Sequence, residues 1–294
     1  MTTRWILLGS DEPLLASLAA DAPSGVGCVA AGTDIDARVR AALAAGEQRF
    51  AVVGGDVELH ATVDSMRARI EDGWTGPGLR LRFPEDPSID PHEQVSLCVA
   101  LLPTAPGGLA ATLGIEPDAR AALTMLATDR AWGPLDVGLV TIDERRTVLV
   151  SAFDVGVDTL ARRERRTVSL TLDGRLAKRR RDEVGTHSRD DEPLGWIAIA
   201  NGQYEGASRI APRAVPHDRA FDVLIGRGDA RAVRRWRRAA RRSAHVPDPA
   251  IEEWLSDGVS MRFSEPVTAR LDGAPTSMER FEVRMSRLGI ALKI

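Results

Sequence analysis

A glycine pair followed by an aspartate gives this chain a segment that could bind phosphate. The apolar run at 51–53 reads as a buried parallel strand, and Gly54, Gly55 and Asp56 follow it directly. Glycines at such a point let the backbone turn where a Cβ would clash, so that amide N–H groups face an anion at the next helix N-terminus. The segment therefore predicts a phosphate-binding turn, with an ordinary strand-to-helix turn of an α/β domain as the alternative.

Further segments follow this turn in a recognisable order. They are Leu102-Pro103 through Leu113-Gly114-Ile115, then Gly133–Gly138, Phe153–Asp158, Asn201–Gly206, Ile210–Ala214 with Phe221–Leu224, and Leu271–Pro275. In order and spacing they resemble the diacylglycerol kinase and sphingosine kinase family of lipid kinases, whose fold is shared with the NAD kinases. The resemblance spans most of residues 50–294.

The resemblance implies phosphoryl transfer from ATP, with Mg²⁺, to a lipid hydroxyl of the diacylglycerol class. Such a reaction needs positioned phosphates, a metal ion and a base that accepts the hydroxyl proton. The resemblance assigns catalytic roles to Asp56 and Asp272, and a metal-ligand role to Asp218. The nucleotide-binding residues that it implies are Gly54, Gly55, Asp56, Glu58, Thr104, Gly107 and Gly108.

The nucleotide-binding segments depart from the family pattern. Val57 and Glu58 stand where the family has glycine and threonine, and the loop at 103–110 has neither asparagine nor aspartate. Glu58 would bring a negative charge toward a triphosphate, at a cost of about 1 to 4 kcal/mol at about 4 Å unless a metal ion lies between them. A Pro-Gly-Gly turn that starts a helix at Leu109 explains the second segment equally well.

The catalytic turn departs as well. Ala274 replaces the glutamate that the resemblance implies as general base, and Asp272 lies two residues away on a strand that reverses side-chain direction at every residue. Loss of a general base typically lowers the rate by about 10²–10⁴. Arg219 follows Asp218 where the family has glycine, so a solvated loop is the alternative to a metal site.

The elements that must position these residues divide the chain in two. Residues 1–130 alternate short apolar runs with helical patterns, which predicts a parallel sheet with helices on both faces. Residues 131–285 show strand signals separated by turns, among them runs at 147–153, 258–263 and 267–271, which predicts an antiparallel β-sandwich. The resemblance implies that 286–294 return to the first domain and that the ligand lies between the domains. Residues 71–93 read as an insertion.

Composition limits the class of protein. A chain of 294 residues with 44% hydrophobic residues can build two cores. Cys28 and Cys98 read as buried thiols, and no apolar run approaches the roughly 20 residues of a membrane span, which predicts a cytoplasmic protein. The net charge of −3 excludes a globally basic nucleic-acid binder.

A strongly basic helix is expected at residues 231–244. Its arginines fall largely on one arc, and the small apolar residues with Trp236 fall on the other. Arg234, Arg235 and Arg238 are the expected contacts to an anionic membrane surface. The alternative is a helix packed by Trp236 with its arginines solvated or paired with Glu252 and Glu253.

Three functions remain open from the sequence. The first is an ATP-dependent lipid kinase with atypical motifs. The second is a catalytically inactive relative that binds nucleotide or lipid, and the third is a kinase of a soluble acceptor such as NAD. The expected partners are a nucleotide and a lipid acceptor or anionic membrane, without nucleic acid, and a homo-oligomer is left open.

Overall fold

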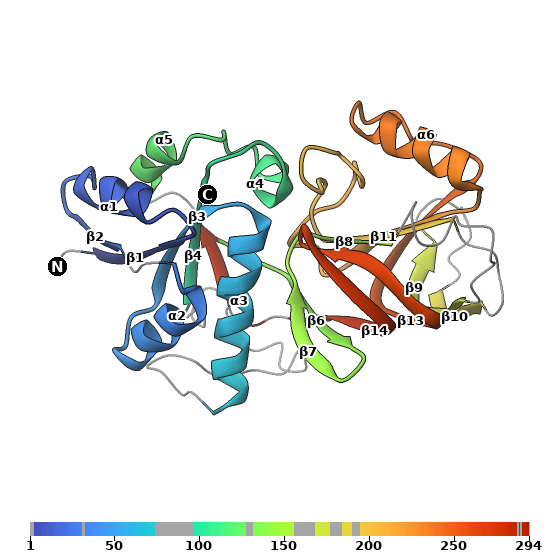
Figure 1. Cartoon of the computed structure of the whole chain (residues 1–294), viewed down its shortest axis with the longest axis horizontal. Helices are drawn as coiled ribbons and strands as arrows, with labels where there is room; N and C mark the ends of the chain where they lie inside the picture. Colours follow the sequence, from blue (N-terminus) through green and yellow to red (C-terminus); the bar gives the residue numbers. More distant parts are fainter. Residues whose placement is uncertain are drawn as a thin grey trace. The chain divides into compact units, whose positions relative to one another are not determined.

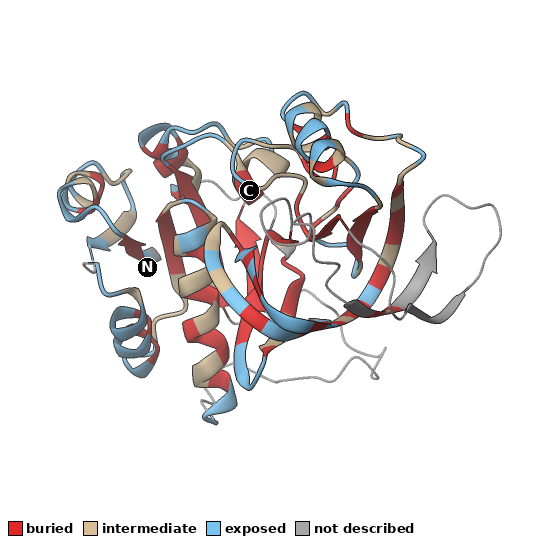
Figure 2. Ribbon diagram, turned by 45° about the vertical axis from the view of Figure 1, so that its right-hand side comes forward, coloured by how far each residue is buried: buried red, intermediate tan, exposed pale blue. Residues whose placement is uncertain are grey.

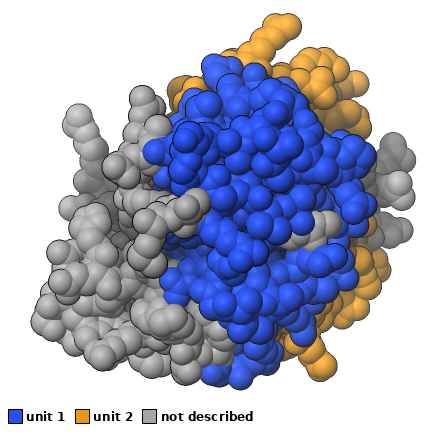
Figure 3. Space-filling model, turned by 90° about the vertical axis from the view of Figure 1, so that its left-hand side faces the viewer, with its two compact units in different colours: residues 1–106, 113–136, 287–294 blue, residues 107–112, 137–286 orange. Residues whose placement is uncertain are grey.

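The computed structural model describes residues 3–30, 33–73, 97–127, 132–155, 168–176, 184–189, 195–286, 288 and 290–293. Residues 74–93 of the expected insertion and 156–158 of one resembling segment lie outside the described residues. Two compact units are present, coloured separately in Figure 3. The first comprises 1–106, 113–136 and 287–294, and the second comprises 107–112 and 137–286.

The first unit is a parallel sheet with helices. Its elements are β1 (Thr3–Gly9), α1 (Glu12–Ala20), β2 (Val26–Ala30), α2 (Ile35–Ala44), β3 (Arg49–Gly54), α3 (Asp56–Glu71), β4 (Leu97–Pro103), α5 (Ala119–Leu123), the 3-10 helix η2 (Thr124–Ala127), β5 (Trp132–Pro134) and β15 (Ile290–Lys293). The strand order is β2-β1-β3-β4-β15-β5. The strand β15 joins β4 in parallel, and β5 runs antiparallel to β15 at the edge.

Alternating apolar side chains let helices cover both faces of this sheet. Trp5 and Leu7 of β1 pack in one cluster with Leu15 and Leu18 of α1 and with α5, whereas α2 and α3 cover the opposite face (Figure 1). Aspartate side chains begin three of the helices by accepting backbone N–H groups in the first turn. The donors lie at Leu14, Ala37 and Ala121.

The second unit is antiparallel and β-rich. Its elements are α4 (Gly108–Thr112), β6 (Val137–Ile142), β7 (Arg145–Leu149), β8 (Ala152–Val155), β9 (Val168–Leu176), β10 (Val184–Arg189), β11 (Trp196–Ala200), β12 (Phe221–Gly226), α6 (Ala230–Ala240), β13 (Ile251–Leu271) and β14 (Ala274–Ser286). The path of the sheet is β12-β11-β8-β13-β14-β6-β7, and β9 joins β10 to β13.

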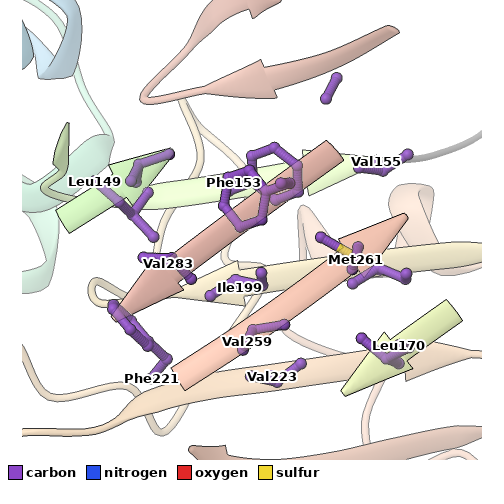
Figure 4. Packing of buried hydrophobic residues seen from close by; sticks show 14 of the residues in the cluster. Leu149, Phe153, Val155, Leu170, Ile199, Phe221, Val223, Val259, Met261 and Val283 are labelled. Atoms are coloured by element: carbon purple, nitrogen blue, oxygen red, sulfur yellow. The ribbon is translucent and has the colours of Figure 1, made fainter. Parts of the chain in front are cut away.

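The long strand β13 bends this sheet around its core. Its first part pairs with β12, and its last two residues pair with β8. Because β11 pairs with both β8 and β12, these four strands form a closed ring of neighbours. The side chains inside form one apolar cluster, part of which Figure 4 shows. In it the rings of Phe153 and Phe281 stack with centroids 4.0 Å apart. Burial of this cluster is the main stabilising term of the unit.

Helix α6 covers the other face of the same sheet. Val233, Trp236 and Ala240 are buried against Trp196 and Leu224 of the strands below, whereas the outer side of the helix is exposed (Figure 2). The indole Nε1 of Trp236 donates to Asp248 at 2.9 Å. The helix is therefore held by one apolar stripe, as its sequence predicts.

The expected fold class, an α/β part followed by an antiparallel β part, is confirmed. Two differences appear in the strands. The run at 147–153, expected as one strand, is divided between β7 and β8, and the runs at 258–263 and 267–271 belong to the single strand β13. Within the described part of the chain, no helix is long and apolar enough to cross a membrane.

Candidate functional site

The glycine turn joins β3 to α3, as the sequence predicts. Gly54 has φ of +147°, and a Cβ there would lie 2.6 Å from the carboxylate oxygen Oε2 of Glu58. Gly55 is the N-cap of α3 and is exposed. The positive φ favours glycine at position 54, and a larger residue there would also displace the carboxylate of Glu58.

Glu58 reaches back over this turn. One carboxylate oxygen accepts the backbone N–H of Gly55 at 2.9 Å, and the other accepts the hydroxyl of Ser10 at 3.0 Å. A glutamate at the third helical position that binds the N-cap N–H is the reciprocal half of a capping box. The amide that would face a phosphate is therefore already bound to an internal anion.

The start of α3 carries a second negative charge. Asp56 occupies the first turn of the helix together with Glu58, and its side chain is half-buried. Carboxylates at a helix N-terminus interact favourably with its positive dipole end and offset it. The attraction of this helix end for a phosphate is correspondingly reduced.

The glycines of the loop after β4 serve packing against another loop. Gly107 has φ of +114°, and a Cβ there would lie 1.9 Å from the carbonyl oxygen of Gly206. The N–H of Gly108 donates to that same oxygen at 3.0 Å. Thr104, the remaining expected nucleotide contact of this loop, is exposed. Close backbone contact accounts for both glycines without a ligand.

Asp272 is buried in the second unit and has three backbone donors. Its carboxylate accepts the N–H groups of Val150 at 3.0 Å, Ser151 at 2.8 Å and Ala152 at 3.0 Å, and the residue is 1% exposed. These donors form the break between β7 and β8. The carboxylate therefore stabilises a bend of the backbone, and this contact is the physical reason that the expected single strand is divided.

The backbone of Asp272 also explains the Asp-Gly pair. Asp272 and Gly273 have φ of +48° and +84° and join β13 to β14 by a two-residue turn between Leu271 and Ala274. Two consecutive residues with positive φ define the hairpin turn that Asp-Gly favours. Ala274 begins β14 and offers no titratable group, so no basic side chain stands at the expected position of the base.

The Asn201-Gly202 pair supports the same bend. The side-chain amide of Asn201 donates to the carbonyl of Val150 at 3.0 Å, and the two backbone N–H groups donate to the carbonyl of Ser151. The hydroxyl of Thr112 in α4 then accepts the N–H of Gln203 at 2.8 Å. Two of the segments that carry the resemblance in this unit, 201–206 and 271–275, thus bind the same bend at 150–152.

The expected Mg²⁺ residues do not form a metal site. Asp218 is exposed and accepts the N–H of Ala220 at 3.1 Å, which makes it a turn residue. Asp222, nearby in β12, is buried, and burial followed by the charges of Asp218 and Glu253 raises its pKa to about 7. Among the described residues no group of three or more His, Cys, Asp or Glu side chains is placed to hold a metal ion. Asp218, the expected ligand, is thus not part of such a group.

A buried charged cluster was not predicted from the sequence. Asp154 of β8 accepts the indole N–H of Trp196 and pairs with Arg237 of α6, whose guanidinium lies 3.5 Å from the carboxylate of Glu205. Burial raises the pKa of Glu205 and lowers the pKa of Arg237. The signal that could have revealed the cluster is the position of Arg237, four residues after Val233, on the inward side of the helix.

The structure groups the predicted site residues within each unit. Gly54, Gly55 and Glu58 come together at the start of α3. Gly107 and Gly108 contact the loop at Gly206, and Asp272 holds the bend at 150–152. The N–H groups of Gly55 and Gly108 and the carboxylate of Asp272 thus have partners inside the chain.

Comparison with solved structures decides the fold family. The chain aligns with a diacylglycerol kinase from Bacillus anthracis str. Sterne with a TM-score of 0.66 and 11% identity, over 99% of this chain and 96% of that one. This chain has the fold of the diacylglycerol kinases. An NAD kinase from Archaeoglobus fulgidus in complex with ATP aligns with a TM-score of 0.51 and 8% identity, over 99% of this chain and 94% of that one.

The diacylglycerol kinase-like fold is what these likenesses establish, because the identities are low. No family model matches the chain. A comparison with curated proteins also finds no match.

Proposed function

We propose that this chain keeps the diacylglycerol kinase fold as a binding protein and does not transfer phosphate. The observation that carries the proposal is the carboxylate of Glu58 on the N–H of Gly55. An ATP phosphate would have to displace this internal anion and then lie beside its negative charge. Glycine-rich turns bind phosphate through free amides, and the N-cap amide of this turn is bound to Glu58.

The second unit supports the same proposal. A general base must accept a proton from the attacking hydroxyl and therefore needs an accessible lone pair within hydrogen-bonding distance. Asp272 is 1% exposed and binds three backbone N–H groups, and Ala274 has no basic atom. Asp56 is the other carboxylate with an assigned catalytic role. It is half-buried and lies in the first turn of α3.

An ATP-dependent kinase is the second candidate. Its support is the shared fold with a protein named diacylglycerol kinase and with an NAD kinase in complex with ATP. Gly55 is also exposed, so the turn is reachable from solvent once Glu58 rotates away. In this second candidate function the acceptor is a lipid hydroxyl or a soluble molecule such as NAD, with ATP and Mg²⁺ as cofactors.

A transfer assay separates the two candidates. The purified chain is incubated with Mg-ATP labelled in the γ-phosphate and with diacylglycerol in detergent micelles, and NAD replaces the lipid in a parallel sample. The proposal predicts no labelled product from either acceptor. It also predicts that Ala274→Glu alone leaves the chain inactive, because Glu58 still occupies the turn.

The assay has a clear contrary outcome. Labelled lipid or NADP formed by the wild-type chain, and lost in Asp56→Asn, would establish a kinase and overturn the proposal. The matched control is Asp257→Asn, which removes an exposed carboxylate of β13. Product formed equally by the wild type and by both variants would trace the signal to a contaminating enzyme instead.

A further inference from the structure

The outer face of α6 carries the most concentrated charge in the described part of the chain. Residues 230–242 contain seven arginines and no acidic residue. Six of them are exposed. The four that belong to α6 fall within about a third of the helix circumference, opposite the buried stripe, and the other two follow in the turn after Ala240. They are Arg231, Arg234, Arg235, Arg238, Arg241 and Arg242, and we call them the arginine face.

Acidic residues lie near part of the arginine face. At the start of α6, the backbone N–H of Ala232 and then the charges of Arg231 and Arg234 lower the pKa of Asp229. One of the six, Arg235, forms an ion pair within the described part of the chain, with Asp248 at 3.9 Å. Glu252, an expected partner of the helix, binds Arg227 at 2.9 Å instead. The seventh arginine, Arg237, turns inward to Asp154 and Glu205. Within the described residues, Arg238, Arg241 and Arg242 therefore form no ion pair, and their charge can act on a bound partner.

The arginine face is also held rigidly. Val233, Trp236 and Ala240 are 0 to 1% exposed, and Asp229 begins the helix by accepting the N–H of Ala232. These contacts leave α6 little freedom to turn its arginines away from the outer side. A preorganised array of charges loses less conformational entropy on binding than a mobile one.

We propose that the arginine face docks on the surface of an anionic phospholipid bilayer. Guanidinium groups bind phosphate by two parallel N–H donors, and a straight row of them on one helix is complementary to a flat array of lipid phosphates. The apolar stripe of α6 is used inside the protein, so binding is electrostatic, without insertion. This inference rests on the proposed function, because it names an anionic lipid surface as the ligand of that binding protein.

The net charge of the chain favours a membrane over a nucleic acid. The net charge of −3 repels a long polyanion that would contact more than one face of the protein. A bilayer would contact only the side that carries the helix. Arg235 contributes less than its neighbours because Asp248 already lies near it. Arg234, Arg238 and Arg241 form no ion pair among the described residues and are the contacts that the proposal places on the bilayer.

Vesicle sedimentation tests the proposal with the full chain. The wild type should bind phosphatidylcholine vesicles that contain phosphatidylserine, and should not bind phosphatidylcholine alone. Each basic residue near such a surface contributes about 1 kcal/mol, so Arg234→Ala, Arg238→Ala and Arg241→Ala together should lower the partition coefficient by about 100-fold. Raising the salt concentration should release the wild type.

A matched variant controls for total charge. Arg38→Ala, Arg145→Ala and Arg280→Ala together remove the same charge from exposed positions of α2, β7 and β14, and should retain binding. Thermal melting of both triple variants shows whether they are folded. Equal binding by the two, salt-insensitive binding, or no binding by the wild type would overturn the proposal. So would tighter binding to duplex nucleic acid or to an acidic peptide at equal salt.

The same samples keep the two proposals distinguishable. Phosphate transfer from ATP by the wild type would overturn the binding-protein proposal without altering the sedimentation result. Failure of sedimentation would remove the membrane-docking proposal and leave the absence of transfer as it stands.

Discussion

Glu58 caps the start of α3 with its own carboxylate. Its carboxylate binds the N–H of Gly55 and the hydroxyl of Ser10, two groups that belong to different strand-to-helix connections. A cap of this kind contributes about 1 kcal/mol. By capping the helix, Glu58 therefore lowers the capacity of the helix end to bind an external anion. Helix stability and nucleotide binding both require the N–H of Gly55.

At the same scale, we expect Asp272→Asn to destabilise the chain by about 3 kcal/mol. An amide offers one oxygen where three backbone N–H groups need acceptors, and its own N–H₂ would face a donor in a buried place. Urea unfolding measures the effect, and Asp257→Asn in the exposed part of β13 is the control. An unchanged unfolding midpoint would show that Asp272 is free for another role.

The raised pKa of Asp222 predicts that the free energy of unfolding depends on pH. Burial, then Asp218 and Glu253, raise its pKa from 3.8 to about 7 against the opposing charge of Arg213. Between these values the folded chain keeps a proton that the unfolded chain has released, so the free energy of unfolding falls as pH rises through this range. The fall is at most about 1.4 kcal/mol per pH unit.

The variant Asp222→Asn isolates this contribution. Its free energy of unfolding should fall less than that of the wild type between about pH 4 and pH 7, with parallel curves above pH 7. Urea unfolding at a series of pH values measures the difference between the two proteins. Parallel curves through the whole range would contradict the assigned cause, since the neutral amide of an asparagine cannot titrate.

At the scale of elements, the contact between the loops at Gly107 and Gly206 is the least tolerant of change. We expect Gly107→Ala to cost about 3 kcal/mol or more, because its Cβ would lie 1.9 Å from a carbonyl oxygen at a φ of +114°. Gly46→Ala is the matched control, with positive φ and no atom within 4 Å of the Cβ. It should cost about 1 kcal/mol.

Thermal or urea unfolding of the two glycine variants makes the comparison. Equal costs at Gly107 and Gly46 would mean that backbone strain alone decides the effect. A larger cost at Gly107 assigns this glycine to packing between loops, the role that its contacts indicate.

The elements that sequence patterns predict well are those with local causes. The alternation of apolar runs and helical patterns in residues 1–130 predicted the parallel sheet, because periodicity reports which face is buried. The division of 147–153 could not be predicted, since its cause is Asp272, 120 residues later in the chain. The inward turn of Arg237 depends likewise on a distant Asp154.

The candidate site shows the same limit at the scale of the whole molecule. The position of Gly54 and Gly55 at a strand-to-helix turn followed from sequence, and so did the presence of a negative charge at Glu58. That this charge binds the turn itself depends on a rotamer and on Ser10, 48 residues away. The fold is shared with a diacylglycerol kinase at 11% identity, so the fold alone does not determine which side chains form a site.

Calorimetric titration with Mg-ATP tests the central claim most directly, because it measures occupation of the turn without requiring an acceptor. The wild-type chain should give no saturable heat at ATP concentrations up to about 1 mM, the upper end of typical enzyme affinities. Glu58→Gly, which frees the N–H of Gly55, should bind more tightly than the wild type. Micromolar binding of Mg-ATP by the wild type, unchanged in Glu58→Gly, would contradict the account.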